Sequence, residues 1–378
     1  MTDLVQLEIK ILAKAFGLDK SELGDISEQD VKLIESIAIS QSIVPLICFG
    51  LKLYGKSHLL SEIMINDENK AIFDYSQREA AIIEISKAFE KENISYIPLK
   101  GAFLCNLYPH PWMRTCSDID ILVKENELEK AIKVLESNTS FSFFQRAHHD
   151  VHFYNDRVHL ELHFSLLTRY EKIDSILSKA WTYTINKNNS CQQLFTPEFN
   201  VFYNIAHSAK HLIRYGGIGI RPILDLLVLK NFTDYDENVV ENYCEEAGLF
   251  GLYQTCLKLI NVWFYGDVHN DVSKEFERLV LSGGVFGSEH IRIISNKRKD
   301  EGHSYISKRI FRSSESIKMY FPICRKYPIL IPYYQIVRWL RIIRAKNKNH
   351  YYSEINKAKS VNQEEVKRYD QLLKAMGL

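Results

Sequence analysis

The sequence predicts an α+β protein in which a small mixed β-sheet lies between two helical regions. Residues 93–167 alternate short apolar runs with charged amphipathic stretches, which is the pattern of strands and helices in one mixed unit. Residues 2–92, and those from about 197 onward, instead repeat apolar side chains at helical spacing. We therefore expect an N-terminal helical region over 1–92, a mixed core over 93–190 and a C-terminal helical domain over 191–378.

The composition is that of an ordinary globular protein. The 378 residues are long enough for two or three domains, and 46% are hydrophobic and 25% charged. A formal net charge of +1 argues against a sequence-independent nucleic-acid binder, which would carry a large basic excess. The seven cysteines are scattered without a Cys-x-x-Cys pair, so neither a zinc ribbon nor a disulfide framework is expected. The N-terminus has no secretion-signal pattern, and we expect a cytoplasmic protein.

In the N-terminal region, apolar side chains form one helical stripe, made of Val31, Ile34, Ile37 and Ala38. Ser27 and Asp30 form a capping motif before this stripe, and Pro45 is expected to end or kink the helix. Residues 80–89 then form a second amphipathic helix that leads directly into the first strand of the core.

The core begins with an apolar strand, a glycine turn and a short helix, and a second strand follows, Ser117-Asp-Ile-Asp-Ile-Leu-Val. Side chains two apart on a strand face the same way, so Asp118 and Asp120 project together. Two such carboxylates repel each other unless a cation lies between them, and Mg²⁺ favours carboxylates combined with substrate phosphates. Gly101, at the turn, would let a phosphate approach the backbone at the start of the helix.

The rest of the core supplies a third carboxylate. An amphipathic helix is expected over 125–137, and strands near 141–146, 151–154 and 158–164, with a tight turn at Asn155-Asp156. Polar and apolar residues alternate along the last of these strands. As a result, His159, Glu161 and His163 share one strand face.

Farther along the chain, Asn204-Ile-Ala-His-Ser-Ala-Lys-His places His207 and His211 one helical turn apart, with Lys210 alongside. Histidines at this spacing could ligate zinc, but the Glu of a His-Glu-x-x-His motif and a third ligand are missing. Two other interpretations stay open. In the structural one, Arg221 pairs with Asp225 across a turn and the histidines satisfy buried carbonyls. In the functional one, this helix forms a wall that faces a nucleotide.

The late segment 320–344 is aromatic and basic. Three prolines and several charges interrupt it, so it does not predict a membrane-spanning helix. It either packs against its own domain while its Arg and Lys stems reach water, or makes weak contact with a membrane surface or nucleic acid.

The strand, Lys-Gly turn, helix and Asp-x-Asp strand resemble the core of the DNA polymerase β-like nucleotidyltransferase superfamily. Within it, the chain is most similar to a large, poorly characterised bacterial nucleotidyltransferase family, and the resemblance covers most of the chain. The matching residues are Leu99-Lys100-Gly101, Tyr108-Pro109, Arg114, Asp118 to Val123, His207, Lys210-His211, Arg221, Asp225, Gly284-Val-Phe-Gly287, Tyr327-Pro and Pro332. One departure is Ala102, since the superfamily usually has Ser or a second Gly at this point of the turn.

The resemblance implies transfer of a nucleoside monophosphate from a nucleoside triphosphate to an acceptor hydroxyl, with release of pyrophosphate. Asp118, Asp120 and Glu161 would hold two Mg²⁺ ions ~3.5–4 Å apart. Glu161 would ligate the ion that activates the attacking oxygen or take the acceptor proton. The residues expected at the nucleotide phosphates are Lys100, Gly101, Ala102, Arg114, Ser117, His207 and Lys210.

Two other classes of function stay open. One is a non-catalytic nucleotide-binding module that regulates a partner, which Ala102 favours because the serine hydroxyl contact to phosphate is missing. The other is an interaction protein in which the core is only a scaffold. The acceptor stays open as well, among small molecules, peptides, proteins and RNA ends.

Overall fold

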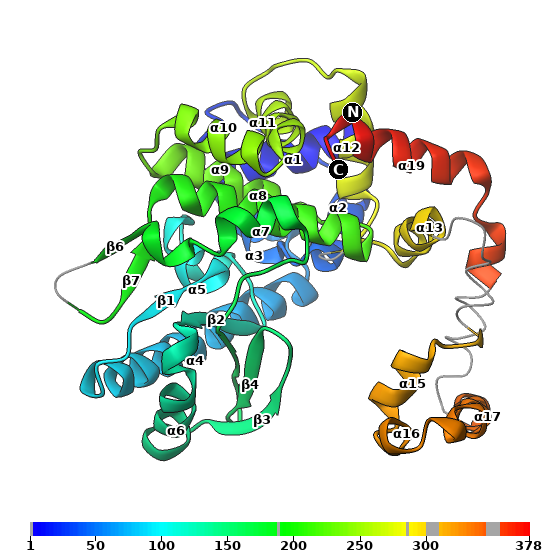
Figure 1. The fold of residues 1–378 in the computed structure, drawn as a ribbon. Coiled ribbons are helices and arrows are strands. Elements are labelled where there is room, and N and C mark those ends of the chain that lie inside the picture. Colours follow the sequence, from blue (N-terminus) through cyan, green and yellow to red (C-terminus); the bar gives the residue numbers. More distant parts are fainter. Residues whose placement is uncertain (1–2, 187–189, 285–286, 300–309, 345–355) are drawn as a thin grey trace.

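A computed structural model describes residues 3–186, 190–284, 287–299, 310–344 and 356–378 (Figure 1). Helices make up most of it, and they surround one small mixed β-sheet, so the predicted α+β class is confirmed. The middle residues of the Gly284-Val-Phe-Gly287 motif lie outside the described residues.

The sheet has five strands in the order β1-β2-β5-β4-β3. The central pair, β2 and β5, is parallel, and all other neighbours are antiparallel. A small hairpin that the sequence did not predict, β6 with β7, lies beside β1. The strands are β1 Tyr96–Pro98, β2 Asp118–Val123, β3 Ser142–Arg146, β4 Asp150–Tyr154, β5 His159–His163, β6 Thr184–Asn186 and β7 Gln193–Phe195.

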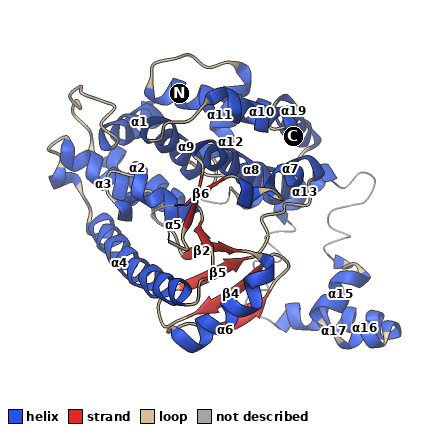
Figure 2. Ribbon diagram, turned by 60° about the vertical axis from the view of Figure 1, so that its left-hand side comes forward, coloured by secondary structure: helices blue, strands red, loops and turns tan. Residues whose placement is uncertain are grey.

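The register of β2 and β5 sorts polar and apolar side chains onto opposite faces of the sheet. Asp118 is opposite His159, and Asp120 is opposite Glu161. Between them, Ile119, Ile121 and Leu160 point to the other face and are buried in a small core. That face is covered by α4 (Glu62–Lys91) and α6 (Leu128–Asn138), whereas the helical layer that includes α8 lies on the polar side (Figure 2).

The N-terminal region is helical as predicted, with α1 (Asp3–Ala15), α2 (Glu28–Gln41) and α3 (Val44–Leu53) before α4. The hydroxyl of Ser27 accepts the Asp30 N–H, which confirms the expected cap. The expectation for Pro45 was wrong. The α2 helix ends at Gln41, four residues before it, and the capping residue Ser42 adopts a left-handed φ of 56°. Pro45 lies in the first turn of α3, where a missing N–H costs nothing.

The C-terminal helices share one large core with α1, α2 and α3. Figure 1 shows α1 beside α11, although about 240 residues separate them in the sequence. The division of the chain into three regions stays a prediction. The helices are α5 Lys100–Leu104, α7 Glu171–Leu177, α8 Pro197–Tyr215, α9 Arg221–Phe232, α10 Glu237–Glu246, α11 Phe250–Phe264, α12 Asp271–Leu281, α13 Glu289–Lys299 and α19 Gln363–Ala375.

The late aromatic and basic segment folds into α15 (Ser314–Tyr320), α16 (Ile323–Lys326) and α17 (Ile331–Arg344), which lie apart from the other helices in Figures 1 and 2. Among the described residues, no helix combines the length and the apolar character needed to cross a bilayer. Short 3-10 helices span Ser57–Leu59, Cys105–Leu107, Pro111–Met113, Glu125–Glu127, Ala180–Thr182 and Pro328–Leu330.

Candidate active site

The three predicted carboxylates lie on the polar face of the two central strands. One ligand atom from each of Asp120, Glu161 and His163 lies within 4.8 Å of the other two, so these residues form a compact donor group. Asp120 is 4% exposed. Asp118 lies next to this group and is only partly buried. The parallel register brings Asp120 and Glu161 together from positions 41 residues apart in the sequence.

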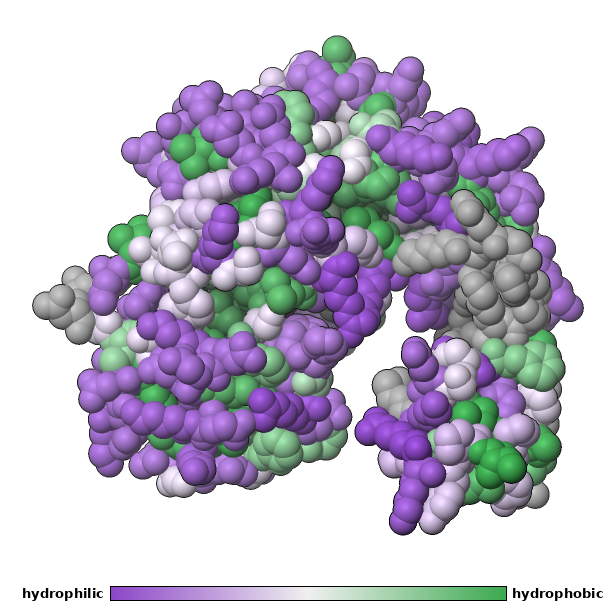
Figure 3. Space-filling view, in the orientation of Figure 1, coloured by the Kyte–Doolittle hydropathy of each residue, from purple (hydrophilic) through white to green (hydrophobic). Residues whose placement is uncertain are grey.

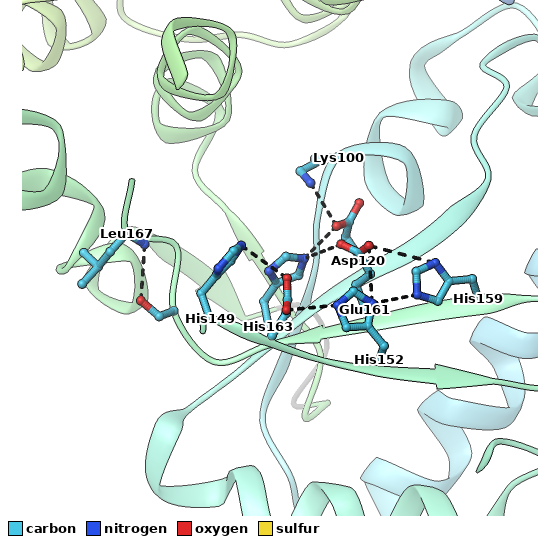
Figure 4. A network of polar contacts seen from close by, with 10 residues as sticks. Lys100, Asp120, His149, His152, His159, Glu161, His163 and Leu167 are labelled. Carbon is cyan, nitrogen blue, oxygen red and sulfur yellow. Dashed lines mark hydrogen bonds and ion pairs between the residues drawn. The ribbon is translucent and has the colours of Figure 1, made fainter. Parts of the chain in front are cut away.

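Two nitrogen groups contact Asp120. Its Oδ1 lies 3.0 Å from the Lys100 ammonium and 2.7 Å from Nε2 of His163 (Figure 4). Burial alone would raise the pKa of Asp120, but Lys100 and His163 bring it well below its usual range. For Asp118 the opposite holds, because burial and the neighbouring Asp120 raise its pKa. The two aspartates share one strand face, but their pKa values are shifted in opposite directions.

His163 joins the carboxylates to each other. Its Nε2 also lies 3.6 Å from Oε2 of Glu161. Burial lowers the pKa of His163, yet the hydrogen bonds to Asp120 and Glu161 outweigh burial and raise it. The sequence placed His163 on this face without predicting its contact with Asp120. His163 lies two residues after Glu161 on the same strand, and this spacing could have predicted that it lies near the carboxylates.

The first residue of α5, Lys100, lies beside the carboxylates. Lys100 has a φ of 42°, a left-handed conformation that is strained for a residue with a side chain. Gly101, expected to let a phosphate approach the backbone, does not have a positive φ. It instead allows close packing, since a Cβ there would lie 2.8 Å from Nη1 of Arg114 and 2.9 Å from Sγ of Cys116. Gly101 also lines the cavity above the carboxylates.

The next residue of the turn corrects an expectation. The Ala102 N–H donates to the Leu99 carbonyl, and the Ala102 side chain packs against the core beneath the sheet. Ala102 lines neither of the two cavities at the site, so a phosphate contact there has no support. Ser117 is exposed and lines the first cavity.

Arg114 was expected to contact phosphate, and it lines the first cavity with its guanidinium paired to Asp225. Its Nε and Nη2 donate to the two oxygens of Asp225 at 2.7 and 2.8 Å, and the Tyr108 hydroxyl donates to the same carboxylate at 2.7 Å. The Arg114 and Asp225 side chains are 8% and 5% exposed. The structural interpretation paired Arg221 with Asp225, but Nη1 of Arg221 donates to the Thr115 carbonyl. This network joins the sheet region to α9.

Helix α8 forms a wall over the site. His207 and His211 line two cavities, of about 600 and 730 Å³, that meet at Lys100 and Asp118. Burial lowers the pKa of His211 to about 4 and that of His207 well below its usual value, so both rings are neutral near pH 7. Within the described part of the chain, neither belongs to a group of three metal-type ligands, which argues against a zinc site on α8.

Histidines of β4 that sequence reasoning missed extend the polar face. The rings of His152 and His159 are parallel within 8°, and Nδ1 of His152 lies 2.9 Å from Nε2 of His159. Asp150 is buried and lies 3.3 Å from both His149 and His152. Alternation along β4, read together with the β4–β5 hairpin, was the signal that could have placed these side chains beside Glu161.

The donor set fits Mg²⁺. Asp118, Asp120 and Glu161 offer oxygen atoms on one face, and the most buried of them, Asp120, already has a cationic partner in Lys100. Such a buried carboxylate needs positive charge next to it. The residues are those that a divalent cation and substrate phosphates would require.

Comparison with known proteins agrees with this geometry. The sequence model of a family described as an uncharacterised nucleotidyltransferase matches residues 27–265. The chain belongs to this nucleotidyltransferase family. The match runs from the cap of α2 to the end of α11, so this nucleotidyltransferase family includes the sheet, the Lys-Gly turn and the α8 wall. A search of curated proteins finds no match.

Proposed function

We propose that the protein transfers a nucleoside monophosphate from a nucleoside triphosphate to an acceptor hydroxyl, with Mg²⁺ and with release of pyrophosphate. One observation carries the proposal: Asp120 and Glu161 lie side by side on parallel strands, directly below the Lys100 turn. Membership of the nucleotidyltransferase family supports the reaction class.

Each residue has a role that its position supports. Asp118, Asp120 and Glu161 would hold two Mg²⁺ ions, which when bound neutralise phosphate charge and make the attacking hydroxyl more acidic. The Lys100 ammonium, 3.0 Å from Asp120 and at the cavity wall, is placed to contact phosphate oxygens. Glu161, partly exposed to the second cavity, is placed to accept the proton of the acceptor.

The test is nucleotide transfer by Asp118→Asn and Asp120→Asn, measured with each labelled triphosphate, Mg²⁺ and a cell extract. Both variants should lose transfer and keep their fold by circular dichroism, because an amide matches the carboxylate in size but not in charge. Asp156→Asn, in the exposed turn before β5, is the matched control and should transfer at the wild-type rate. Wild-type turnover by either site variant would refute the proposal.

The regulatory alternative differs in one measurable way. A nucleotide-binding module without chemistry should bind a triphosphate with Mg²⁺, and lose that binding in Asp120→Asn, but yield no labelled product. A scaffold should show no metal-dependent nucleotide binding. Titration calorimetry beside the transfer assay separates all three functions.

Weak membrane contact through 320–344 was one of the two interpretations of this segment, and the exposure of its side chains supports it. In the part of this segment that the structure describes, Ile329 is 87% exposed and Tyr320 63%, while Arg325 and Lys326 are exposed on α16. Figure 3 shows apolar and charged side chains mixed on this surface. In a flotation assay, the wild-type protein should rise through the gradient with anionic vesicles. The double variant Arg325→Gln/Lys326→Gln should show a smaller vesicle-bound fraction. With no lipid contact, the protein would stay in the cytoplasm, where its sequence predicts it.

A further inference from the structure

The two cavities at the site share one wall and differ in the carboxylates that complete them. Both are lined by Lys100, Asp118 and three residues of α8. Beyond this shared wall, the first contains Gly101, Ser117 and Asp120, and the second contains Glu161 and His163. A transferase with two substrates needs such an arrangement, because donor and acceptor must approach the reacting atoms from different directions.

The contents of the cavities suggest which substrate each one takes. The first includes Asp120 together with Lys100 and Ser117, and a carboxylate and a cation side by side suit a metal-bound triphosphate, so this cavity suits the nucleotide. The second includes Glu161, the carboxylate placed to accept a proton from the attacking hydroxyl. The second cavity is therefore the one that suits the acceptor.

Lys210 contributes a positive charge to the second cavity. It lines this cavity and not the first. Among the residues that the structure describes, no carboxylate lies within ion-pair distance of its ammonium. Burial, together with the positive charges of Lys100 and Arg214, lowers the pKa of Lys210 and outweighs the opposing effect of Asp150 and Glu161. A half-buried ammonium without an ion pair is stabilised when an anion binds beside it.

The histidines of the second cavity are suited to a hydroxyl-bearing ligand. Burial lowers the pKa of His149, and that of His211, to about 4. Neutral imidazoles offer one donor and one acceptor each and add no charge. In this cavity, therefore, Lys210 can neutralise an anion while the rings bind hydroxyl groups.

On this basis, which rests on the proposed function, we propose that the acceptor is a hydroxyl compound with an anionic group, a phosphate or a carboxylate, held by Lys210 in the second cavity. Lys210 then belongs to the acceptor site and not to the nucleotide phosphates, where the sequence had placed it.

The experiment is calorimetry on the full chain in two steps. A non-hydrolysable nucleoside triphosphate with Mg²⁺ is titrated first. Glycerol 3-phosphate, glycerate and glycerol are then titrated as separate probes, with and without that nucleotide. The wild type should bind one or both anionic probes and not glycerol, and the two anionic arms distinguish phosphate from carboxylate.

Lys210→Gln should weaken binding of the anionic probe roughly 10-fold or more, since a charged hydrogen bond is lost, and leave nucleotide affinity unchanged. Lys210→Arg should restore most of the probe binding and so rule out misfolding as the cause. Lys179→Gln, at an exposed position after α7, is the matched control.

Three results would overturn the proposal: no binding of either anionic probe, equal binding by Lys210→Gln, or loss of nucleotide affinity in that variant. None of these depends on the proposed reaction, because the nucleotide titration of the wild type tests that function separately.

Discussion

At the scale of single residues, neighbouring groups decide what each carboxylate can do. Asp118 and Asp120 are equivalent in the sequence, but Lys100 and His163 contact Asp120 alone. These contacts lower the pKa of Asp120 and keep it ionised, whereas the pKa of Asp118 is raised. A cation bound between them would relieve the repulsion that the structure leaves at Asp118.

Substitution of Glu161 and of His163 shows which side chain contributes more to the transfer rate. If Glu161 accepts the acceptor proton, Glu161→Gln should reduce the transfer rate by roughly 10²–10⁴. His163→Gln should cost less, because the remaining amide can still donate to Asp120 and Mg²⁺ prefers oxygen ligands. The measurement is single-turnover transfer at saturating nucleotide. A larger loss in His163→Gln would identify the histidine as the base.

Glu8, far from the site, makes the stability of the protein depend on pH. Its side chain is fully buried in α1, neither oxygen accepts a hydrogen bond from a described residue, and burial raises its pKa from 4.5 to about 7. The folded state therefore binds more protons than the unfolded state between these values. The contribution of Glu8 to stability is highest below about pH 4.5 and is lost as pH rises through about 7, by about 3 kcal/mol in total.

Glu8→Gln should remove this dependence. Urea unfolding at pH 8 should show the variant more stable than the wild type, by up to about 3 kcal/mol. At pH 5 the two should be similar. Glu22→Gln, at an exposed loop position, should leave the free energy of unfolding unchanged at both pH values. If the wild type kept its stability from pH 5 to 8, Glu8 would have to be ionised or hydrated in the fold.

At the scale of elements, side-chain networks join segments far apart in the sequence. Arg114, before β2, pairs with Asp225 on α9. The Gln41 side chain, at the end of α2, donates to the carbonyls of Val280 and Gly283 and accepts the N–H of Ile220. Both networks are buried. The first joins the sheet region to α9, and the second joins α2 to the start of α9 and the end of α12.

Asp225→Ala should be strongly destabilising, because it leaves the Arg114 guanidinium buried without its partner. The expected loss is about 3–5 kcal/mol in the free energy of unfolding. Arg114→Met combined with Asp225→Leu should recover much of it, since no buried charge remains. Asp234→Ala, exposed just after α9, provides the comparison in the same denaturation series. A small loss in Asp225→Ala would mean that water reaches the guanidinium.

At the scale of the whole molecule, two cores support the site from opposite sides. One lies beneath the sheet with α4 and α6, and the other joins α1, α2 and α3 to the C-terminal helices. The carboxylates and both cavities lie between these cores. The site therefore depends on packing between the first and last thirds of the chain.

Leu12→Ala tests this shared core. Leu12 is fully buried in α1, so the cavity should cost about 2–5 kcal/mol. Amide hydrogen exchange should speed up in α11 as well as in α1, because the two helices pack together. Leu33 lies in α2 and is 48% exposed, so Leu33→Ala should change neither the free energy of unfolding nor the exchange rates in α1 and α11. Faster exchange confined to α1 would show that the N-terminal helices form a separate unit.

The sequence by itself determined the five main strands and which side chains share a face of each strand. Strand alternation has a strict period of two, so Asp118 with Asp120, and Glu161 with His163, had to share faces once their strands were recognised. The Ser27 cap and the helical period of the flanking regions are equally local properties. These expectations were correct because only neighbouring residues decide them.

Tertiary structure alone decided the partners of the charged groups. Arg114 and Lys210 both suggested phosphate contacts, because a cation near a motif looks the same in a sequence whether or not a carboxylate pairs with it. Packing brought Asp225 to Arg114 and left Lys210 in the second cavity. Packing between α8 and the sheet also divided the site into two cavities. Interactions between residues a hundred positions apart depend on how helices pack, and no local period encodes that.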